Sequence, residues 1–369
     1  MAKVCLGDVA NERKENCKTN EYDDHIVGLE HLIPQEVILT QWAENMETTF
    51  TKVFHKGDIL FGRRRAYLKK AAVAPFDGIC SGDITVIEAK PNKIVSELLP
   101  FIIQNDNFFD YAVEKSAGSL SPRVKWSHLQ NYEFELPDLD KQRELAELLW
   151  AAEETKQAYK KLYTMTEFIL QSLFTKMFGN INSQPIYKPQ NLTNFVDIRD
   201  DLRSPIKDSE RQSMKLAPVL YPYYGATGCL DYINKYKVDF EAICIAEDCG
   251  NYNAGENSSY IISRKCWVNN HAHILKPKID KCNITFLNFY FKMLNLTNII
   301  SGSTRAKLTK GSLERLNVYL PDIYTQNTFS DIIQKSKESS MNILNQIETL
   351  NKIKREILTQ QLNKEVSHV

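Results

Sequence analysis

A dense group of basic side chains in the first third of the chain has the chemistry to bind phosphate groups. Arg63, Arg64 and Arg65 are consecutive, and Lys69 and Lys70 follow closely. Guanidinium and ammonium groups neutralise phosphates, and arginine also forms paired hydrogen bonds with guanine. This cluster therefore predicts nucleic-acid contact, and a solvated surface turn is the alternative.

A second candidate surface lies in a frame that the chain carries twice. GSLSPRVKWSHLQNYEFELPD occupies residues 118–138 and GSTRAKLTKGSLERLNVYLPD occupies residues 302–322, with six identical positions out of 21. A Gly-Ser start allows the backbone to approach a phosphate closely. The polar positions that we expect to contact DNA are Ser119, Ser121, Arg123 and Lys125 in the first copy and Ser303, Thr304, Arg305 and Lys307 in the second.

The spacing between the two frames also relates segments upstream of them. At this spacing KGDILFG (56–62) falls on FEAICIA (240–246), and both segments predict a buried strand. A slightly longer spacing aligns 80–91 with 266–277. Internal repeats of this length indicate a duplicated domain, so the arginine cluster has a counterpart at residues 247–253, where Asn251 and Asn253 could read base edges.

Other side chains of the second half are weaker candidates for the same role. Arg199, Arg203 and Lys207 form a basic stretch. Tyr223, Tyr224 and Thr227 flank Gly225 in a predicted loop, and core packing of at least one tyrosine is as good an interpretation as DNA contact. His271 and His273 share one face of a predicted strand, for which a structural role is favoured over a metal site.

Each frame leads into a long segment with helical periodicity. No proline or glycine interrupts residues 138–178 or 322–369, which predicts two helices of about 35–40 residues, some 50–60 Å long. The heptad positions that we expect to be buried are Leu145, Leu148, Ala152, Thr155, Tyr159, Leu162, Thr166, Ile169 and Leu173, with Phe329, Ile332, Ser336, Ser339, Ile343, Gln346, Leu350, Ile353 and Ile357 in the second helix. The two helices are predicted to bury these stripes against each other.

The predicted fold is α+β, with two mixed α/β globular domains separated by two long antiparallel helices that form a coiled coil. The expected boundaries are 1–137 for the first domain, 138–179 for the central helix, 180–321 for the second domain and 322–369 for the C-terminal helix.

Composition excludes several classes of protein. The 46 basic and 46 acidic side chains balance, although residues 180–321 carry 18 basic and 13 acidic groups. No apolar run suits a signal peptide or a membrane span, and the eight cysteines are never spaced as CxxC, so we expect a cytoplasmic protein with reduced thiols. No glycine-rich cofactor loop and no phosphate loop is present, so the chain is predicted to bind no cofactor and to have no catalytic or metal residues.

The order of domain, helix, domain and helix, with LPDLDKQRELAELL at 136–149, resembles the specificity (S) subunit of type I restriction–modification systems. The family pattern at the helix start matches Leu136, Pro137, Leu139, Gln142, Arg143, Glu144 and Ala146, and the second copy keeps Leu320, Pro321, Ile323 and Gln326. Asn327 and Thr328 depart from it. The segments at 221–251 and 267–275 resemble a recognition-domain type of the same family.

The resemblance implies a non-catalytic subunit that reads a bipartite double-stranded DNA target and scaffolds two methyltransferase (M) subunits and the restriction (R) subunits. It implies partner contacts at Gln142, Arg143 and Gln326. S-adenosylmethionine, ATP and Mg²⁺ are then expected on the partner subunits only. A coiled-coil scaffold that binds protein without DNA specificity is the alternative, and a standalone enzyme is disfavoured by the missing motifs.

Overall fold

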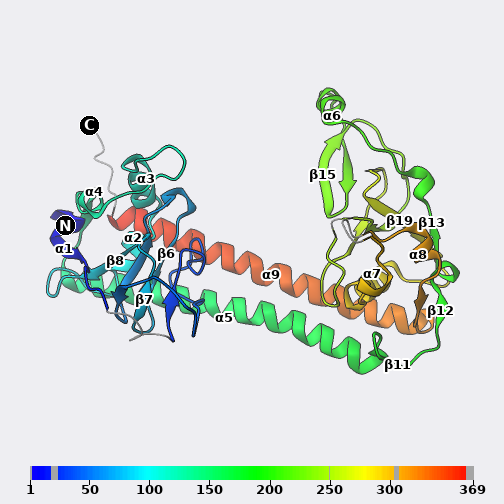
Figure 1. Ribbon diagram of the computed structural model, residues 1–369, viewed down its shortest axis with the longest axis horizontal. Coiled ribbons are helices and arrows are strands. Elements are labelled where there is room, and N and C mark those ends of the chain that lie inside the picture. Colours follow the sequence, from blue (N-terminus) through cyan, green and yellow to red (C-terminus); the bar gives the residue numbers. More distant parts are fainter. Residues whose placement is uncertain (1, 18–23, 249, 303–306, 363–369) are drawn as a thin grey trace. The chain divides into compact units, whose positions relative to one another are not determined.

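The computed structural model describes residues 2–17, 24–248, 250–302 and 307–362, which form two compact units. Unit 1 contains residues 1–160 and 344–369, and unit 2 contains residues 161–343. Each unit is a mixed α/β domain together with one part of each of two long helices, Leu139–Phe178 (α5) and Ile323–Leu362 (α9) (Figure 1). The predicted fold class is confirmed.

The domain of unit 1 is built on a four-stranded antiparallel sheet of order β2-β8-β5-β6. A three-stranded sheet, β3-β7-β4, and the pair β1-β9 complete it. Its strands are Ala2–Cys5 (β1), Ala10–Glu12 (β2), Ile26–Val27 (β3), Lys52–Phe54 (β4), Ile59–Gly62 (β5), Ala71–Val73 (β6), Gly78–Cys80 (β7), Ile84–Ala89 (β8) and Glu133–Leu136 (β9). Its short helices are Leu6–Val9 (α1), Leu99–Ile103 (α2), Asp106–Glu114 (α3) and Trp126–Leu129 (α4).

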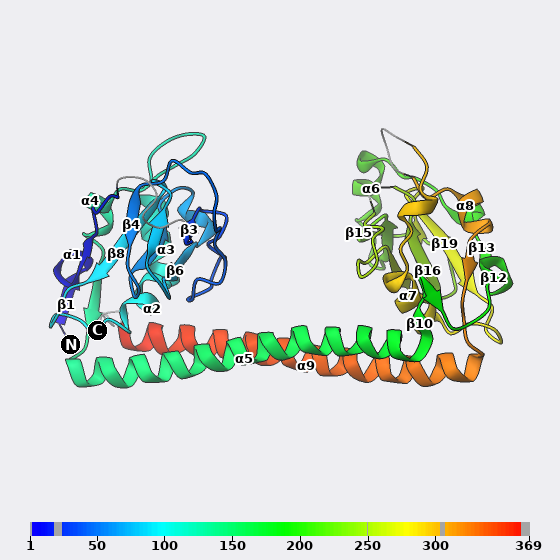
Figure 2. The same ribbon diagram turned by 60° about the horizontal axis from the view of Figure 1, so that its bottom comes forward.

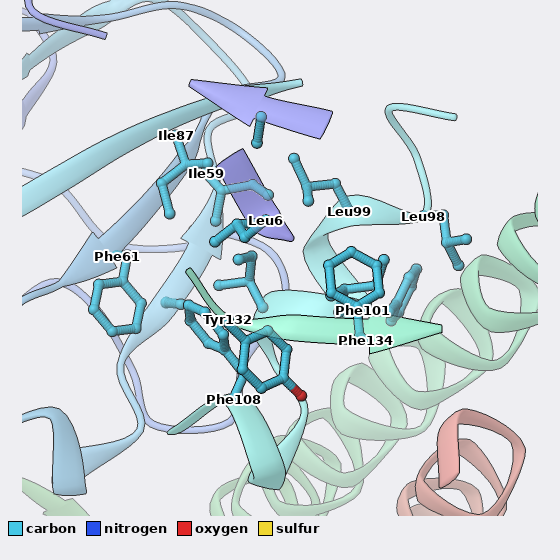
Figure 3. Close-up of a cluster of buried hydrophobic side chains, with 14 of the residues drawn as sticks. Leu6, Ile59, Phe61, Ile87, Leu98, Leu99, Phe101, Phe108, Tyr132 and Phe134 are labelled. Atoms are coloured by element: carbon cyan, nitrogen blue, oxygen red, sulfur yellow. The ribbon is translucent and has the colours of Figure 1, made fainter. Parts of the chain in front are cut away.

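Aromatic and branched side chains fill the core of this domain (Figure 3). Phe61 from β5 packs on Phe108 and Phe109 of α3, with ring centroids 5.5 and 5.7 Å apart. The strand β5 is buried on both faces, which explains why its sequence reads as a continuous apolar run instead of an alternating one.

Unit 2 repeats this plan with the sheet order β13-β19-β16-β17. A second sheet has the order β15-β14-β18, and two strand pairs are β10-β11 and β12-β20. Its strands are Gly179–Asn180 (β10), Gln184–Pro185 (β11), Gln190–Asn191 (β12), Val196–Ile198 (β13), Tyr221–Gly225 (β14), Gly228–Ile233 (β15), Ala242–Ala246 (β16), Ser259–Ile262 (β17), Trp267–Val268 (β18), Ala272–Pro277 (β19) and Asn317–Val318 (β20). Its helices, besides the long ones, are Asp208–Met214 (α6), Ile284–Met293 (α7) and Lys310–Glu314 (α8).

Strand register corrects one part of the predicted repeat. Ile59 of β5 pairs with Ile87 of β8, and Ile243 of β16 pairs with Leu275 of β19. The strands β5 and β16 therefore keep the spacing of the two frames, but β8 and β19 are farther apart in sequence than the match of 80–91 with 266–277 predicted. The cysteines and prolines that coincide in that match are not structurally equivalent.

The two long helices lie antiparallel, and aspartate caps both of their starts (Figure 2). In unit 1 the beginning of α5 packs with the end of α9, through Leu145 and Leu149 with Leu358 and Leu362. In unit 2 the end of α5 packs with the beginning of α9, where the rings of Phe178 and Phe329 lie 5.1 Å apart.

The buried stripe of each helix differs from the heptad prediction. Leu145, Phe329 and Ile343 are buried as expected, but Leu148, Leu162, Ile169 and Ile353 are 42–60% exposed. The other buried positions are Gln142, Ala146, Leu149, Glu153, Lys156, Leu170, Phe174 and Phe178 in α5, and Gln326, Ile333, Ser340, Lys354, Leu358 and Leu362 in α9. The buried face is rotated because each helix packs on the adjacent domain as well as on the other helix.

None of the helices in the described ranges has the long apolar stretch that a membrane span requires.

Candidate nucleic-acid interface

In unit 1 the two predicted basic segments form a single surface. The frame docks on the loop that follows β5: the Val124 amide donates to the Arg63 carbonyl at 3.0 Å, and Arg64 and Arg123 form a β-bridge. The frame closes on itself because the amides of Ala117 and Arg123 each donate to the other's carbonyl. The arginine cluster and the repeated frame, although distant in sequence, therefore belong to one site.

Glycine makes the turn of this frame possible. Gly118 has φ +116°, and its counterpart Gly302 has φ +99°. A Cβ on Gly118 would come no closer than 3.5 Å to the Ser121 carbonyl, so space does not demand glycine there. The backbone conformation does, since L-residues rarely adopt it. In this turn Ser119 is exposed and Ser121 is half-buried.

Two of the arginines are held by a carboxylate that sequence analysis missed. Asp83 accepts from Arg123 at 2.7 and 3.2 Å and from the Arg64 Nη1 at 3.4 Å, and Arg64 Nε also donates to the Ser121 hydroxyl. The hydrogen bond from Arg123, with the positive charge of both arginines, holds the pKa of Asp83 below its usual range. The only signal in the sequence was the Gly82-Asp83 pair within the segment 80–91, which the repeat aligns with 266–277.

The other cations of this site divide into available and engaged groups. Arg65 and Lys125 are exposed and form no ion pair within the described ranges, while the buried Nε of Arg63 has no hydrogen-bond partner there. Lys69 instead bonds to Asp106, and Lys70 donates to the Leu29 carbonyl at 2.6 Å. The two lysines are thus engaged by other groups of the domain, whereas Arg65 and Lys125 remain exposed.

Unit 2 contains the same docking arrangement with the charges exchanged. The Leu308 amide donates to the Glu247 carbonyl at 2.8 Å, and Asp248 forms a β-bridge with Lys307. Each of these residues is the exact counterpart, in the repeat, of one that docks the frame in unit 1. A glutamate therefore replaces Arg63, and it holds Arg203 at 2.6 Å and Lys307 at 3.3 Å. Burial would raise the pKa of Glu247, but the hydrogen bond and charge of Arg203 keep it below its ordinary value.

The two histidines tie this site to the sheet. His273 is buried, with Nδ1 2.6 Å from Asp200 Oδ2 and Nε2 2.7 Å from the Leu308 carbonyl. His271 Nδ1 lies 2.8 Å from Asp248 Oδ1. No cluster of three potential metal ligands occurs among the described residues.

The remaining candidate residues of unit 2 differ in exposure and in the groups that they contact. Asn251, Asn253, Lys207 and Thr227 are exposed, Arg199 pairs with Asp201, and Tyr224 is half-buried beside Tyr260. The structure contradicts Tyr223 as a DNA contact: it is 1% exposed, and its hydroxyl accepts from the Ile206 amide in the core. Ser303, Thr304 and Arg305 lie outside the described residues.

Comparison with known proteins identifies the family. A model of the type I restriction modification DNA specificity domain matches residues 1–163 and again residues 187–355. The chain belongs to this family.

Individual relatives agree with the assignment of this DNA specificity chain. A putative type I restriction enzyme specificity subunit of Haemophilus influenzae is 33% identical over 151 residues, 41% of this chain and 37% of that protein. The EcoDI specificity subunit of Escherichia coli is 29% identical over 147 residues, 38% of this chain and 32% of that protein. The matches thus span about a third of the length of these two relatives. The MjaIX specificity subunit of Methanocaldococcus jannaschii is 22% identical over 335 residues, 83% of this chain and 77% of that protein.

Solved structures share the fold of the specificity chain along its whole length. A type I restriction–modification S subunit from M. genitalium superposes with a TM-score of 0.57 at 13% identity, covering 99% of this chain and 96% of that one. A chain from a structure of complex assembly and conformational transition of the type I R-M system superposes with a TM-score of 0.58 at 19% identity, covering 98% of this chain and 97% of that one.

The glutamines at the helix starts of the specificity chain are structural. Gln142 is 2% exposed; its side chain accepts from the Val95 amide at 2.9 Å and donates to the Pro137 carbonyl at 2.8 Å. Gln326, 0% exposed, bonds in the same way to Asn283 and Pro321. Each glutamine fastens its helix to its domain, so a partner could reach neither side chain without a rearrangement. Arg143, paired with Asp140, is exposed beside a groove lined by Val95, Glu97, Ala146, Glu147 and Trp150.

The Asp83 cluster gives a pH-dependent prediction for the specificity chain. Because the folded-state pKa of Asp83 is depressed, its ion pairs stabilise the fold above the ordinary pKa of about 3.9 and lose this effect as pH falls through the lower folded value. We expect Asp83→Asn to lower the Tm by a few degrees at pH 7, and the difference from the wild type to shrink as the pH falls below the ordinary pKa of an aspartate. Thermal unfolding between pH 2.5 and 7 measures this effect. The exposed Asp110, which forms no ion pair within the described ranges, provides the control D110N, whose Tm should follow the wild type throughout.

Proposed function

We propose that this chain is the non-catalytic DNA-recognition subunit of a type I restriction–modification complex, and that each of its domains reads one half of a bipartite target. The observation that carries the proposal is the docking of the repeated frame on the loop after the central strand, built twice from equivalent positions of the repeat. If each domain carries one DNA-reading surface, the duplication of the frame is explained. A scaffold that binds only protein would not need this duplication.

The side chains divide into those that position the site and those that contact DNA. Asp83 and Glu247 fix the arginines and lysine that they bind, so those cations meet a phosphate or base edge already oriented. Arg65 and Lys125 keep their charge free for phosphates, and Asn251 and Asn253 supply amides that suit adenine. The two domains therefore present different chemistry and should read different half-sites.

We infer the partners from the family. Methyltransferase subunits, one at each helix start, and restriction subunits would supply S-adenosylmethionine, ATP and Mg²⁺ chemistry. Contact at Arg143 and its groove is supported by their exposure, whereas Gln142 and Gln326 act beneath the surface. The seven described cysteines are free thiols, which fits a cytoplasmic protein.

Methylation mapping tests the function directly. A host that expresses the chain with its methyltransferase should methylate adenines only in one bipartite sequence, and a host with the methyltransferase alone should not. Stable association with the methyltransferase but methylation without sequence preference would instead favour a protein scaffold.

The long helices predict a change in target spacing. Each has 40 residues and extends about 60 Å. Inserting seven residues in each helix, near 160–163 in α5 and 344–347 in α9, preserves the heptad phase and adds about 10 Å. At about 3.4 Å per base pair, the gap between the half-sites should grow by about three base pairs with both half-sites unchanged. Methylation mapping of the variant measures this gap.

A control separates helix length from chain length. Seven glycine and serine residues inserted between Asn182 and Ser183, in the turn between β10 and β11, lengthen the chain without lengthening a helix. The gap should then stay the same. An active helix-insertion variant with an unchanged gap would show that the helices do not set the spacing.

A further inference from the structure

The helix pair of unit 1 buries charged side chains in the middle of its apolar interface. Glu153 and Lys156 of α5 are 0% and 1% exposed, and Lys354 of α9 is 7% exposed. Lys156 lies 2.7 Å from Glu153 and 3.5 Å from Glu36, which comes from a loop of the domain. Lys354 bonds to the other oxygen of Glu153. These four residues, here called the charge layer, pair with one another.

The charge layer is a costly way to fill a helix interface. Burial lowers the pKa of Lys354, which means that the site resists the charged form of this lysine. Burial also opposes the charge on Glu153, and only the ammonium groups of Lys156 and Lys354 keep its pKa below the ordinary value. Apolar residues at such positions commonly give equal or greater stability, whereas a polar group in a helix interface can specify which helices pair and in which register.

Unit 2 lacks this layer at the equivalent positions. The repeat places Lys337 where Glu153 stands, Ser340 where Lys156 stands and Leu170 where Lys354 stands. Lys337 is exposed, and Leu170 belongs to the apolar core. The Ser340 hydroxyl is buried without a hydrogen-bond partner within the described ranges. The charge layer is therefore specific to the pairing of the first half of α5 with the second half of α9.

A duplicated helix creates competing pairings between two copies of the chain. In an antiparallel pair of two α5 helices, the repeat predicts Leu145 opposite Phe178 and Leu149 opposite Phe174. These contacts are as apolar as those within one chain. Glu153, however, would face Leu170 instead of Lys354, so this buried carboxylate would lose one of its two lysines and keep only Lys156 of its own helix.

A pair of two α9 helices meets the same obstacle. Phe329 would face Leu362 and Ile333 would face Leu358, which are again compatible apolar contacts. Lys354, however, would face Lys337, a like charge in place of Glu153. In both pairings between copies, the apolar layers fit and the charge layer alone discriminates.

We propose that the Glu153–Lys354 layer selects the intramolecular pairing of α5 with α9 and rejects pairing with the helices of a second copy of the chain. The duplicated stripe supplies attraction between any two of these helices, and the charge layer supplies the preference for one combination. This inference depends on the duplication of the helices and not on DNA recognition, so it stands or falls independently of the proposed function.

The test is the oligomeric state of refolded variants of the full chain. Wild type and E153L/K354L are unfolded, refolded at about 100 µM and compared by sedimentation velocity and by co-purification of two differently tagged copies. We expect wild type to remain monomeric and E153L/K354L, in which Lys156 keeps Glu36, to give at least tenfold more mixed dimer with a Tm no lower than that of the wild type. The matched control is E154L/K352L, which adds leucines at two exposed positions of the same helices and should stay monomeric.

A second variant tests the proposal with the charge layer of unit 1 intact. L170K/K337E builds an equivalent layer in unit 2. In a second copy, Glu153 would then face the new lysine of α5, and Lys354 would face the new glutamate of α9. Dimers should again appear, and this variant decides the question if E153L/K354L does not fold. A folded E153L/K354L that stays monomeric, or dimers of E154L/K352L in equal amount, would overturn the proposal.

Discussion

Replacing residues 180–321 with the matching segment of a specificity chain that reads another target should change every base of one half-site and none of the other. The side chains that build the site of unit 2 all come from this segment: Glu247 holds Arg203 and Lys307, and His273 ties the frame to the sheet. The site of unit 1, with Asp83 and Arg123, is built from residues before 137. Within the described parts of the chain, neither site borrows a side chain from the other segment.

Methylation mapping of the chimaera reads the result as an all-or-none change in one half-site. The control replaces residues 323–362 with α9 of the same donor, which should leave the bases of both half-sites as they were. A chimaera of residues 180–321 that altered both half-sites would refute independent reading by the two domains.

Removing the free cations of unit 1 should weaken DNA binding for all sequences to a similar degree. The variant R63Q/R65Q/K125Q loses the half-buried Arg63 and the exposed Arg65 and Lys125, which form no ion pair within the described ranges. Arg64 and Arg123 keep their ion pairs with Asp83. Each phosphate contact contributes about 0.9 to the slope of log affinity against log salt concentration, so three contacts amount to a loss of roughly a hundredfold to a thousandfold at 0.1 M salt. The slope should become shallower by two to three.

The chain is assembled with its methyltransferase for this test. Fluorescence anisotropy of labelled duplexes between 50 and 300 mM salt then measures the affinity and its dependence on salt concentration. The matched control K161Q/K335Q/K337Q removes three exposed lysines from the long helices and should change the affinity little. If both variants lost affinity equally, the surface around Arg65 would have no special part in DNA binding.

Local sequence determined the elements of this protein. The frame, the apolar strand ahead of it and the uninterrupted periodicity of residues 138–178 and 322–369 predicted a domain and a helix, each present twice. These features depend on short-range chemistry, such as the glycine that a turn with positive φ needs and the aspartate that caps a helix. The internal repeat then indicated the order of domains and helices along the chain.

Which side chains are available was decided by tertiary structure alone. In the sequence, Lys69 belonged to the same predicted cluster as Arg65, and Tyr223 was a weaker candidate, but Asp106 engages the lysine and the Ile206 amide engages the tyrosine. Gln142 and Gln326 likewise looked like surface residues and instead fasten helices to domains. Such outcomes depend on groups distant in the sequence, whose approach is fixed by packing and leaves no periodic trace in the sequence.

The buried face of the long helices illustrates the same division. A heptad pattern predicts that a helix has a partner, and it correctly predicted two partnered helices. It placed Leu148 and Ile169 inside, yet they are exposed, while Glu153 and Lys354 are buried. A helix that packs on a domain and on another helix at once presents whichever face serves both contacts, and charged residues can enter that face when each finds its counter-ion there. The sequence by itself therefore determined that the helices pair, and only the tertiary structure decided through which side chains.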